Sequence, residues 1–251
     1  MVERVKSGIP GLDDLLNGGF PLGGMYVILG QAGTCKTILS TAFLRNGAVN
    51  FNEPGVYIML EENKERMMSH MMDFGWDLAQ LESEGKLKVI PYVRSIVGDV
   101  DATFENSMMS GSAGRVSQMR QYLTVDSLLK EITDTCKSIG AKRVVIDPIN
   151  VVTLLSESQV IARMQIIWLL ENLRKLDVTV LATVEEGVGY WEDTMFLSDG
   201  IVHLTLKERD GIHERGIMIR KIRGTSHDTS IRPVKIDEGG MRVYPEEVIF
   251  R

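Results

Sequence analysis

The chain has 251 residues, of which 44% are hydrophobic, and its mean hydropathy is +0.00. This composition is typical of a globular protein with one substantial core, so we expect a single domain over residues 1–251. The formal net charge of −6 gives no overall attraction for nucleic acid. The N-terminus has no apolar signal segment and no uncharged stretch approaches the ~18 residues of a membrane helix, so we expect a cytoplasmic protein without a membrane span.

The first motif lies between a short apolar run, Met25–Leu29, and a proline-free stretch, residues 38–49, that is long enough for a helix. Between them stands the sequence Gly30-Gln31-Ala32-Gly33-Thr34-Cys35-Lys36-Thr37. In a P-loop of this order, backbone N–H groups surround a phosphate, the lysine neutralises charge and the adjacent hydroxyl ligates Mg²⁺. The positive end of the following helix adds to the attraction. The pattern predicts phosphate binding by residues 30–38, ending at Ile38; a turn without a ligand is the alternative.

Cys35 stands where the usual P-loop has glycine. If φ is positive here, the side chain costs roughly 1–2 kcal/mol and crowds the phosphate. One hypothesis is therefore a binding module with impaired turnover. A bolder variant makes Cys35 a redox sensor, because a thiol at a helix N-terminus has a lowered pKa.

Apolar runs and helical patterns alternate through the middle of the chain. A helix is predicted from Val125 to Ile139, with Thr124 as its N-cap and Gly140 beyond its end, and its apolar stripe places Cys136 in the core. The other predicted elements are a strand over 143–147, a helix over 162–176 and a strand over 178–182. This order predicts an α/β fold with a mostly parallel twisted sheet flanked by helices.

From Ile201 onward, short strand-like runs with turns at 209–211 and 237–240 predict an antiparallel meander at the sheet edge. Residues 106–121, rich in Ser, Gly and Met, are expected to form a mobile surface loop. Four methionines at 67, 68, 71 and 72 are interpreted as core filling on an amphipathic helix, with a partner surface as the alternative. Trp76 and Trp168 are interpreted as packing residues.

Acidic residues follow two of the apolar runs. Asp147 ends the strand over 143–147, where a Mg²⁺ ligand belongs because the carboxyl ends of parallel strands gather beside the P-loop. Glu61 and Glu62 end the run Val56–Leu60, which is expected to lie beside the first strand. We interpret one of these glutamates as the group that orients or deprotonates water; the alternative is the acidic first turn of a helix beginning near Asn63.

Two cations, Lys221 and Arg223, alternate on a predicted strand and so project from one face. Such a pair can grip a γ-phosphate in its own subunit or in a neighbour. On pattern alone, a solvated basic edge strand is the simpler interpretation. His227, four residues beyond Arg223, is interpreted as structural or surface-exposed rather than as a base.

Taken together, several segments resemble the KaiC-like branch of the RecA-superfamily ATPases, over nearly the whole chain. They are Ser7-Gly8-Ile9-Pro10-Gly11-Leu12-Asp13, Gly18-Gly19-Phe20-Pro21, the P-loop, Glu61-Glu62, Phe74-Gly75-Trp76-Asp77-Leu78, residues 141–147, residues 221–227 and Val243-Tyr244-Pro245.

The resemblance implies a RecA-like core that binds ATP and Mg²⁺ at subunit boundaries, commonly in a hexameric homo-oligomeric ring. By this match Gly30, Gly33, Lys36 and Thr37 would hold the phosphates and Mg²⁺, and Asp147 would belong to the metal shell. Glu61 and Glu62 would be the catalytic carboxylates, and Lys221 and Arg223 the cations that act on the neighbouring subunit. Autokinase activity is not carried over, because Met195-Phe196 align with the family's phosphoacceptor Ser-Thr pair.

The leading hypothesis is an ATP-dependent oligomeric switch with slow hydrolysis and an unidentified protein partner. A DNA-binding recombinase is the competing hypothesis, because relatives of this fold bind DNA through the loops after later core strands. Here those loops are residues 148–162, which contain no Lys or Arg, and residues 185–197, which contain Glu185, Glu186, Glu192 and Asp193. Phosphates would be repelled, so nucleic acid is not expected as a partner.

Overall fold

The computed structural model describes residues 3–92, 124–154, 156–209 and 211–249, so the loop expected at 106–121 lies outside the described residues. The strands are β1 Arg4–Val5, β2 Phe20–Pro21, β3 Met25–Gly30, β4 Gly55–Met59, β5 Leu87–Pro91, β6 Arg143–Asp147, β7 Thr179–Glu185, β8 Gly200–Arg209, β9 Ile212–Ile222, β10 Arg232–Asp237 and β11 Gly240–Val243. The helices are α1 Leu12–Leu15, α2 Lys36–Asn50, α3 Lys64–Met72, α4 Leu78–Ser83, α8 Val125–Ile139, α9 Asn150–Leu154, α10 Gln159–Arg174 and α11 Trp191–Leu197.

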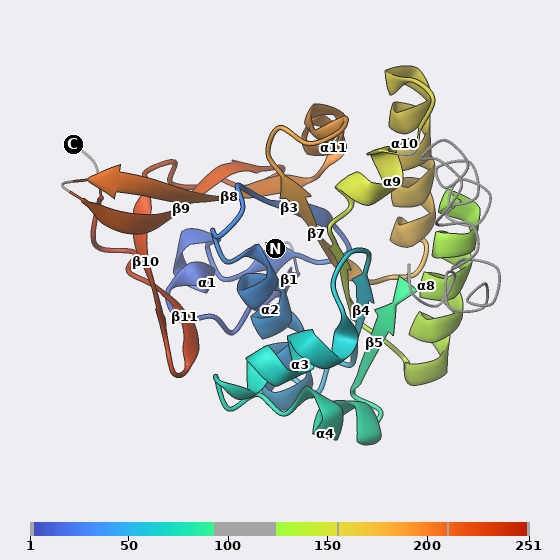
Figure 1. Ribbon diagram of the computed structural model, residues 1–251, viewed down its shortest axis with the longest axis horizontal. Coiled ribbons are helices and arrows are strands. Elements are labelled where there is room, and N and C mark those ends of the chain that lie inside the picture. The colour runs from blue at the N-terminus through green and yellow to red at the C-terminus, as the bar shows by residue number, and fades with distance from the viewer. Residues whose placement is uncertain (1–2, 93–123, 155, 210, 250–251) are drawn as a thin grey trace, which may run out of the picture.

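Nine of these strands form one sheet in the order β11-β10-β9-β8-β3-β7-β6-β4-β5 (Figure 1). The strands from β8 to β5 are parallel, whereas β8, β9, β10 and β11 pair antiparallel with one another. This confirms the predicted parallel core with an antiparallel meander at one edge. The long crossovers with helices are what parallel strands require.

One expectation about strand order is wrong. The strand that precedes Glu61 and Glu62, β4, is not a neighbour of β3, because β7 and β6 lie between them. Consecutive strands are adjacent in most folds but not in all, and here the crossover through α2 passes over two other strands of the sheet. The two glutamates nevertheless remain at the same edge as the P-loop, since β3 and β4 run in the same direction.

Successive side chains along each strand point to opposite faces of the sheet, which divides the core into two layers. On β4, Tyr57 and Met59 pack with α2 and α3 on one face, and Val56 and Ile58 pack with α8 and α10 on the other. Figure 1 shows α2, α3 and α4 grouped on one side of the molecule and α8 and α10 on the other. Strands buried on both faces explain why the parallel core reads as near-continuous apolar runs.

The helix predicted from Val125 to Ile139 is confirmed with its caps. The Thr124 hydroxyl accepts a hydrogen bond from the Ser127 N–H, and Gly140 ends α8 in the left-handed conformation with φ 63°. Cys136 is buried on this helix, as predicted. A left-handed C-terminal residue favours glycine because a Cβ would be strained there.

The methionine and tryptophan interpretations hold in part. Met67 and Met71 are buried in the layer beneath α3, whereas Met72 is 54% exposed, because residues one position apart on a helix face different directions. Trp76 is buried as predicted. The interpretation of Trp168 as a packing residue is wrong: it is 44% exposed on the outer face of α10, whose apolar side is already filled by other residues. Within the described residues, no helix is long and apolar enough to cross a membrane.

Candidate functional site: the P-loop and its acidic neighbours

The glycine-rich loop connects the carboxyl end of β3 to the start of α2. A Cβ at Gly30 would lie 2.4 Å from the Thr34 hydroxyl oxygen, so only glycine fits there. The same hydroxyl donates to the Gln31 carbonyl at 2.8 Å and closes the turn. Gly33 has φ 79°, which also favours glycine. The sequence therefore folds into a compact turn that leads directly into the first turn of α2.

Cys35 precedes α2 in the left-handed conformation, with φ 71°. The strain expected for a side chain at positive φ therefore applies to Cys35. Its side chain makes no capping hydrogen bond to the helix, and the first turn of α2 contains no acidic residue. The N–H groups at the start of α2 therefore lack a side-chain acceptor. Such a helix end attracts an anion through its free donors and its dipole.

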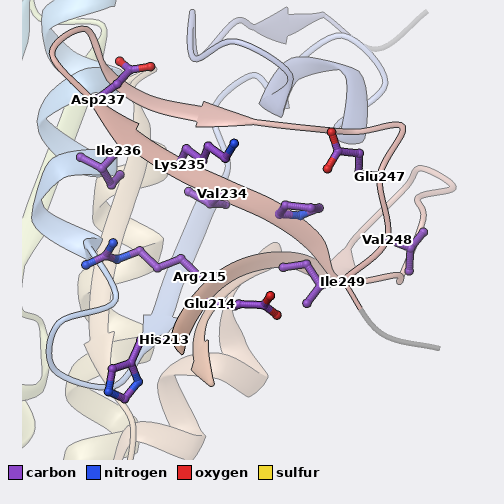
Figure 2. A pocket seen from close by; sticks show the side chains of 11 residues that line it. His213, Glu214, Arg215, Val234, Lys235, Ile236, Asp237, Glu247, Val248 and Ile249 are labelled. Atoms are coloured by element: carbon purple, nitrogen blue, oxygen red, sulfur yellow. The ribbon is translucent and has the colours of Figure 1, made fainter. Parts of the chain in front are cut away.

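The guanidinium group of Arg215, on β9, lies close enough to the Cys35 thiol to lower its pKa. Burial raises the pKa of Cys35, and this effect outweighs the lowering by Arg215 and Lys36. The redox hypothesis, which required a lowered pKa, is therefore wrong in its premise, because desolvation of the thiolate dominates here. Figure 2 shows Arg215 among the residues of β9 and β10 that line a pocket, with its side chain extending away from Ile249.

Lys36 folds back over the loop. Its ammonium group donates to the main-chain oxygens of Gly30 at 2.8 Å and Gln31 at 2.9 Å. Burial lowers its pKa, although Glu185 and Asp147 nearby act in the opposite direction. An ammonium group held by carbonyl oxygens at the loop is positioned to exchange them for phosphate oxygens.

The predicted metal pair is brought together. Asp147 ends β6, and its Oδ2 accepts a hydrogen bond from the Thr37 hydroxyl at 3.0 Å. Two hard oxygen donors at this spacing suit Mg²⁺, which binds proteins through one or two carboxylates together with phosphate oxygens and water. The residues present therefore fit the cation that the P-loop pattern implies.

Glu61 and Glu62 lie after β4 and before Asn63, which caps α3, so they are not part of the first turn of that helix. Both line a cavity of about 180 Å³ together with Lys36, Thr37 and Asp147. Burial raises the pKa of Glu61, and Glu185 and Asp147 raise it further. Burial, followed by Asp147, likewise raises the pKa of Glu62.

A second cavity, of about 440 Å³, adjoins the first. It begins at the P-loop residues 33–38 and extends between α2 and α3 to Asp73 and Phe74. Its walls combine a thiol and apolar side chains with His70 and Asp73. A space of this size beside a phosphate cradle can accept the base and sugar of a nucleotide.

Lys221 and Arg223 do not lie beside the P-loop of their own chain. Lys221 pairs with Ile201 and thereby lies level with Val27, near the start of β3, whereas the P-loop follows the end of that strand. Both side chains donate to the Phe196 carbonyl oxygen, at 3.0 and 3.3 Å, which confirms that they project to the same side. The structure thus places the cations toward the amino ends of the parallel strands and the acids at their carboxyl ends.

Two site residues were missed in the sequence. Glu185 ends β7 and lines the acidic cavity, and the argument that identified Asp147 would have found it, because it too follows a buried parallel strand. Arg215 lies within a long antiparallel strand, where no local pattern distinguishes it from a solvated arginine. Only the pairing of β9 with β8, and of β8 with β3, brings it to Cys35.

Comparison with known proteins agrees with this arrangement. The sequence model of the family described as "ATPase: KaiC" matches residues 5–248. The chain belongs to the KaiC ATPase family. At the level of that family it is an ATP-binding ATPase, and its sheet of mostly parallel strands with an antiparallel C-terminal part matches a KaiC-like RecA fold.

Relatives within the KaiC family differ in length. A UPF0273 protein from Methanocaldococcus jannaschii is 34% identical over 257 residues, covering 99% of each chain. The circadian clock oscillator protein KaiC of a Nostoc species is 31% identical over 254 residues, which cover 97% of this chain but 44% of that protein. The crystal structure of a KaiC-like protein from Pyrococcus horikoshii is 32% identical, with a TM-score of 0.79 and coverage of 98% of this chain and 100% of that one.

Proposed function

We propose that this chain is a Mg²⁺-dependent ATPase that binds ATP on residues 30–38 and acts through one domain over residues 1–251 as an oligomeric nucleotide switch. The observation that carries the proposal is the uncapped start of α2, with Lys36 and the Thr37–Asp147 pair directly beside it. Free N–H donors, an ammonium group and two oxygen ligands converge on one place. This set matches the phosphates of a nucleoside triphosphate and their cation.

The charges around the cavity support a requirement for a cation in nucleotide binding. Four carboxylates line it, those of Glu61, Glu62, Asp147 and Glu185, against the one ammonium group of Lys36. A polyanionic triphosphate entering this site is repelled unless positive charge arrives with it. Mg²⁺ supplies part of this charge and would be held by Thr37 and Asp147, where it polarises phosphate oxygens.

The remaining positive charge points to a second subunit. Lys221 and Arg223 project beside α11, toward the amino ends of the parallel strands, whereas the acids lie at the carboxyl ends. A head-to-tail contact between copies would place these cations of one subunit at the nucleotide of the next, and a rotation that closes would give a ring. We therefore propose a homo-oligomeric ring, with a hexamer as the expected size, in which bound ATP favours assembly.

For the chemical step, we propose that Glu61 is the carboxylate that orients or deprotonates the attacking water, with Glu62 beside it. The pKa of Glu61 is raised by burial and by acids of the same cavity, which brings a carboxylate closer to the range in which a base is effective. Glu62 also lies near His70, at 4.0 Å, on the side of the larger cavity. We accordingly expect Glu61→Gln to lower phosphate release more than Glu62→Gln does.

The decisive experiment measures binding, assembly and turnover together. Calorimetric titration with ATP and Mg²⁺ is compared between the wild type, Lys36→Ala and the control Lys88→Ala, which alters an exposed lysine on β5. Native mass is measured with ATP, with ADP and without nucleotide, alongside phosphate release. We expect the Lys36 variant alone to lose binding and ATP-dependent assembly. Wild-type affinity in Lys36→Ala would show that the loop is not the site.

The pseudo-ATPase alternative makes a different prediction for the same assays. In that case ATP would bind and drive assembly, but phosphate release would stay at background until Cys35 is replaced by glycine. A DNA-binding function would instead appear as a salt-dependent shift of labelled single-stranded DNA at low protein concentration.

A further inference from the structure

Three hydroxyl groups surround the carboxylate of Asp147. Its Oδ2 accepts from Thr37 at 3.0 Å and from Tyr57 at 2.6 Å, and its Oδ1 accepts from Thr183. Thr37 is the last residue of the P-loop motif, so its presence is expected. Tyr57 and Thr183 lie on the strands that flank β6, one on each side, and belong to no motif that the sequence revealed.

Tyr57 is rigidly held. It is 1% exposed and packs in the layer between the sheet and α2. Its strand neighbour across the β4–β6 pair is Val145, two residues before Asp147, so its hydroxyl reaches forward along the sheet to the carboxylate. The main chain reinforces the link, because the Leu60 N–H donates to the Asp147 carbonyl at 2.8 Å.

This arrangement restricts how the carboxylate can turn. Rotation of the Asp147 side chain away from its observed position would break the hydrogen bonds from Tyr57 and Thr183, two side chains that are buried in the sheet. Hydrogen bonds to charged groups are the strong ones, and a donor left unpaired on burial is costly.

We propose that Tyr57 is a positioning residue for Mg²⁺: its buried hydroxyl, with that of Thr183 on the opposite oxygen, fixes the Asp147 carboxylate so that Oδ2 stays beside Thr37. The proposal rests on the proposed function, since it concerns the cation of the same nucleotide site. Groups that orient a metal ligand without touching the metal typically change metal affinity by 10–100-fold when removed.

The test uses a matched pair of variants. Tyr57→Phe removes the hydroxyl that reaches Asp147, and Tyr26→Phe removes an equally short 2.6 Å hydrogen bond from a buried tyrosine on β3 to the Pro21 carbonyl. Equilibrium binding of a fluorescent, non-hydrolysable ATP analogue is measured against Mg²⁺ concentration and again with EDTA. Thermal unfolding is recorded for each protein.

We expect Tyr57→Phe to raise the Mg²⁺ concentration for half-maximal binding about 10-fold or more. In EDTA the wild type and Tyr57→Phe should both bind the analogue weakly and to the same extent, because neither has the cation and the contacts of the loop with phosphate are the same in both. Tyr26→Phe should leave the Mg²⁺ dependence at the wild-type value even if it unfolds at a lower temperature. A shift of less than 2-fold in a folded Tyr57→Phe protein would overturn the proposal, as would an equal shift in both variants.

Thr183 gives a second, independent arm. Thr183→Val should shift the Mg²⁺ dependence in the same direction, whereas Thr183→Ser, which keeps a hydroxyl, should restore the wild-type value. If Tyr57→Phe does not fold, the two Thr183 variants test the proposal by themselves. An equal Mg²⁺ dependence of binding in Thr183→Val and Thr183→Ser would then count against the proposal. If the wild type binds no analogue at any Mg²⁺ concentration, it is the proposed ATP site that fails.

Discussion

The ammonium group of Lys221 lies 2.6 Å from the main-chain oxygen of Ser198, directly after the last turn of α11. It also donates to the carbonyl oxygens of Met195 and Phe196, at 3.3 and 3.0 Å. Carbonyl groups at a helix end have no partner within the helix, and a cation there also meets the negative end of the dipole. Within its own chain, Lys221 therefore stabilises the end of α11, and the proposed contact with a neighbour's phosphate would require it to leave these oxygens.

Replacing Lys221 by methionine should lower the free energy of unfolding by about 1–2 kcal/mol, because the last carbonyl groups of α11 lose their cation. Arg223→Met, at a side chain that is 54% exposed and donates once to Phe196, should cost less than about 1 kcal/mol. Urea unfolding of the nucleotide-free protein compares the two. Equal losses would show that Lys221 has no special role at α11.

Cys35→Gly should stabilise the nucleotide-free protein by about 0.5–1 kcal/mol. Glycine removes the roughly 1–2 kcal/mol strain of a left-handed side chain. Part of this gain is offset because glycine loses more conformational entropy on folding than cysteine does. Cys35→Ala is the control, since it keeps the strained Cβ and removes only the thiol. We expect no gain from alanine, and a gain as large as that of glycine would place the cost in the sulfur instead of the backbone.

Both cysteines should react slowly with iodoacetamide at neutral pH. Burial raises the pKa of Cys35, so its thiolate fraction is below that of a free thiol, and burial raises the pKa of Cys136 to about 11. Alkylation of each site, followed by mass spectrometry from pH 7 to 10, should accelerate with pH. Arg215→Met should slow labelling of Cys35 further, because the guanidinium lowers that pKa. Rapid labelling of Cys35 at pH 7 would contradict the raised pKa.

Glu61→Gln should stabilise the nucleotide-free protein at neutral pH while lowering phosphate release. Burial and the neighbouring Glu185 and Asp147 raise the pKa of Glu61 above its usual 4.5, so the folded state holds this proton more tightly than the unfolded chain. Stability from this group is therefore present at low pH and is lost as the pH rises through the folded pKa. The gain in the variant should shrink toward zero below pH 4.5, as measured by unfolding across pH. A gain that is constant with pH would have another cause.

Several features of this protein follow from the sequence alone. The order of strand, glycine loop and helix predicted the P-loop, and the caps at Thr124 and Gly140 predicted the limits of α8, because these signals are local and depend on backbone conformation over a few residues. Asp147 was found for the same reason, since a charged residue after a buried run has to lie at the end of a strand.

The tertiary structure decided what depends on strand order and side-chain reach. It placed β7 and β6 between β3 and β4, brought Arg215 to Cys35 across the meander, and directed the Tyr57 hydroxyl to Asp147 from a strand that reads as purely apolar. It also placed Lys221 at the end of α11 instead of beside the P-loop of its own chain. Local patterns specify which residues end a strand, but the free energy of packing distant segments determines which strands are neighbours and therefore which side chains meet.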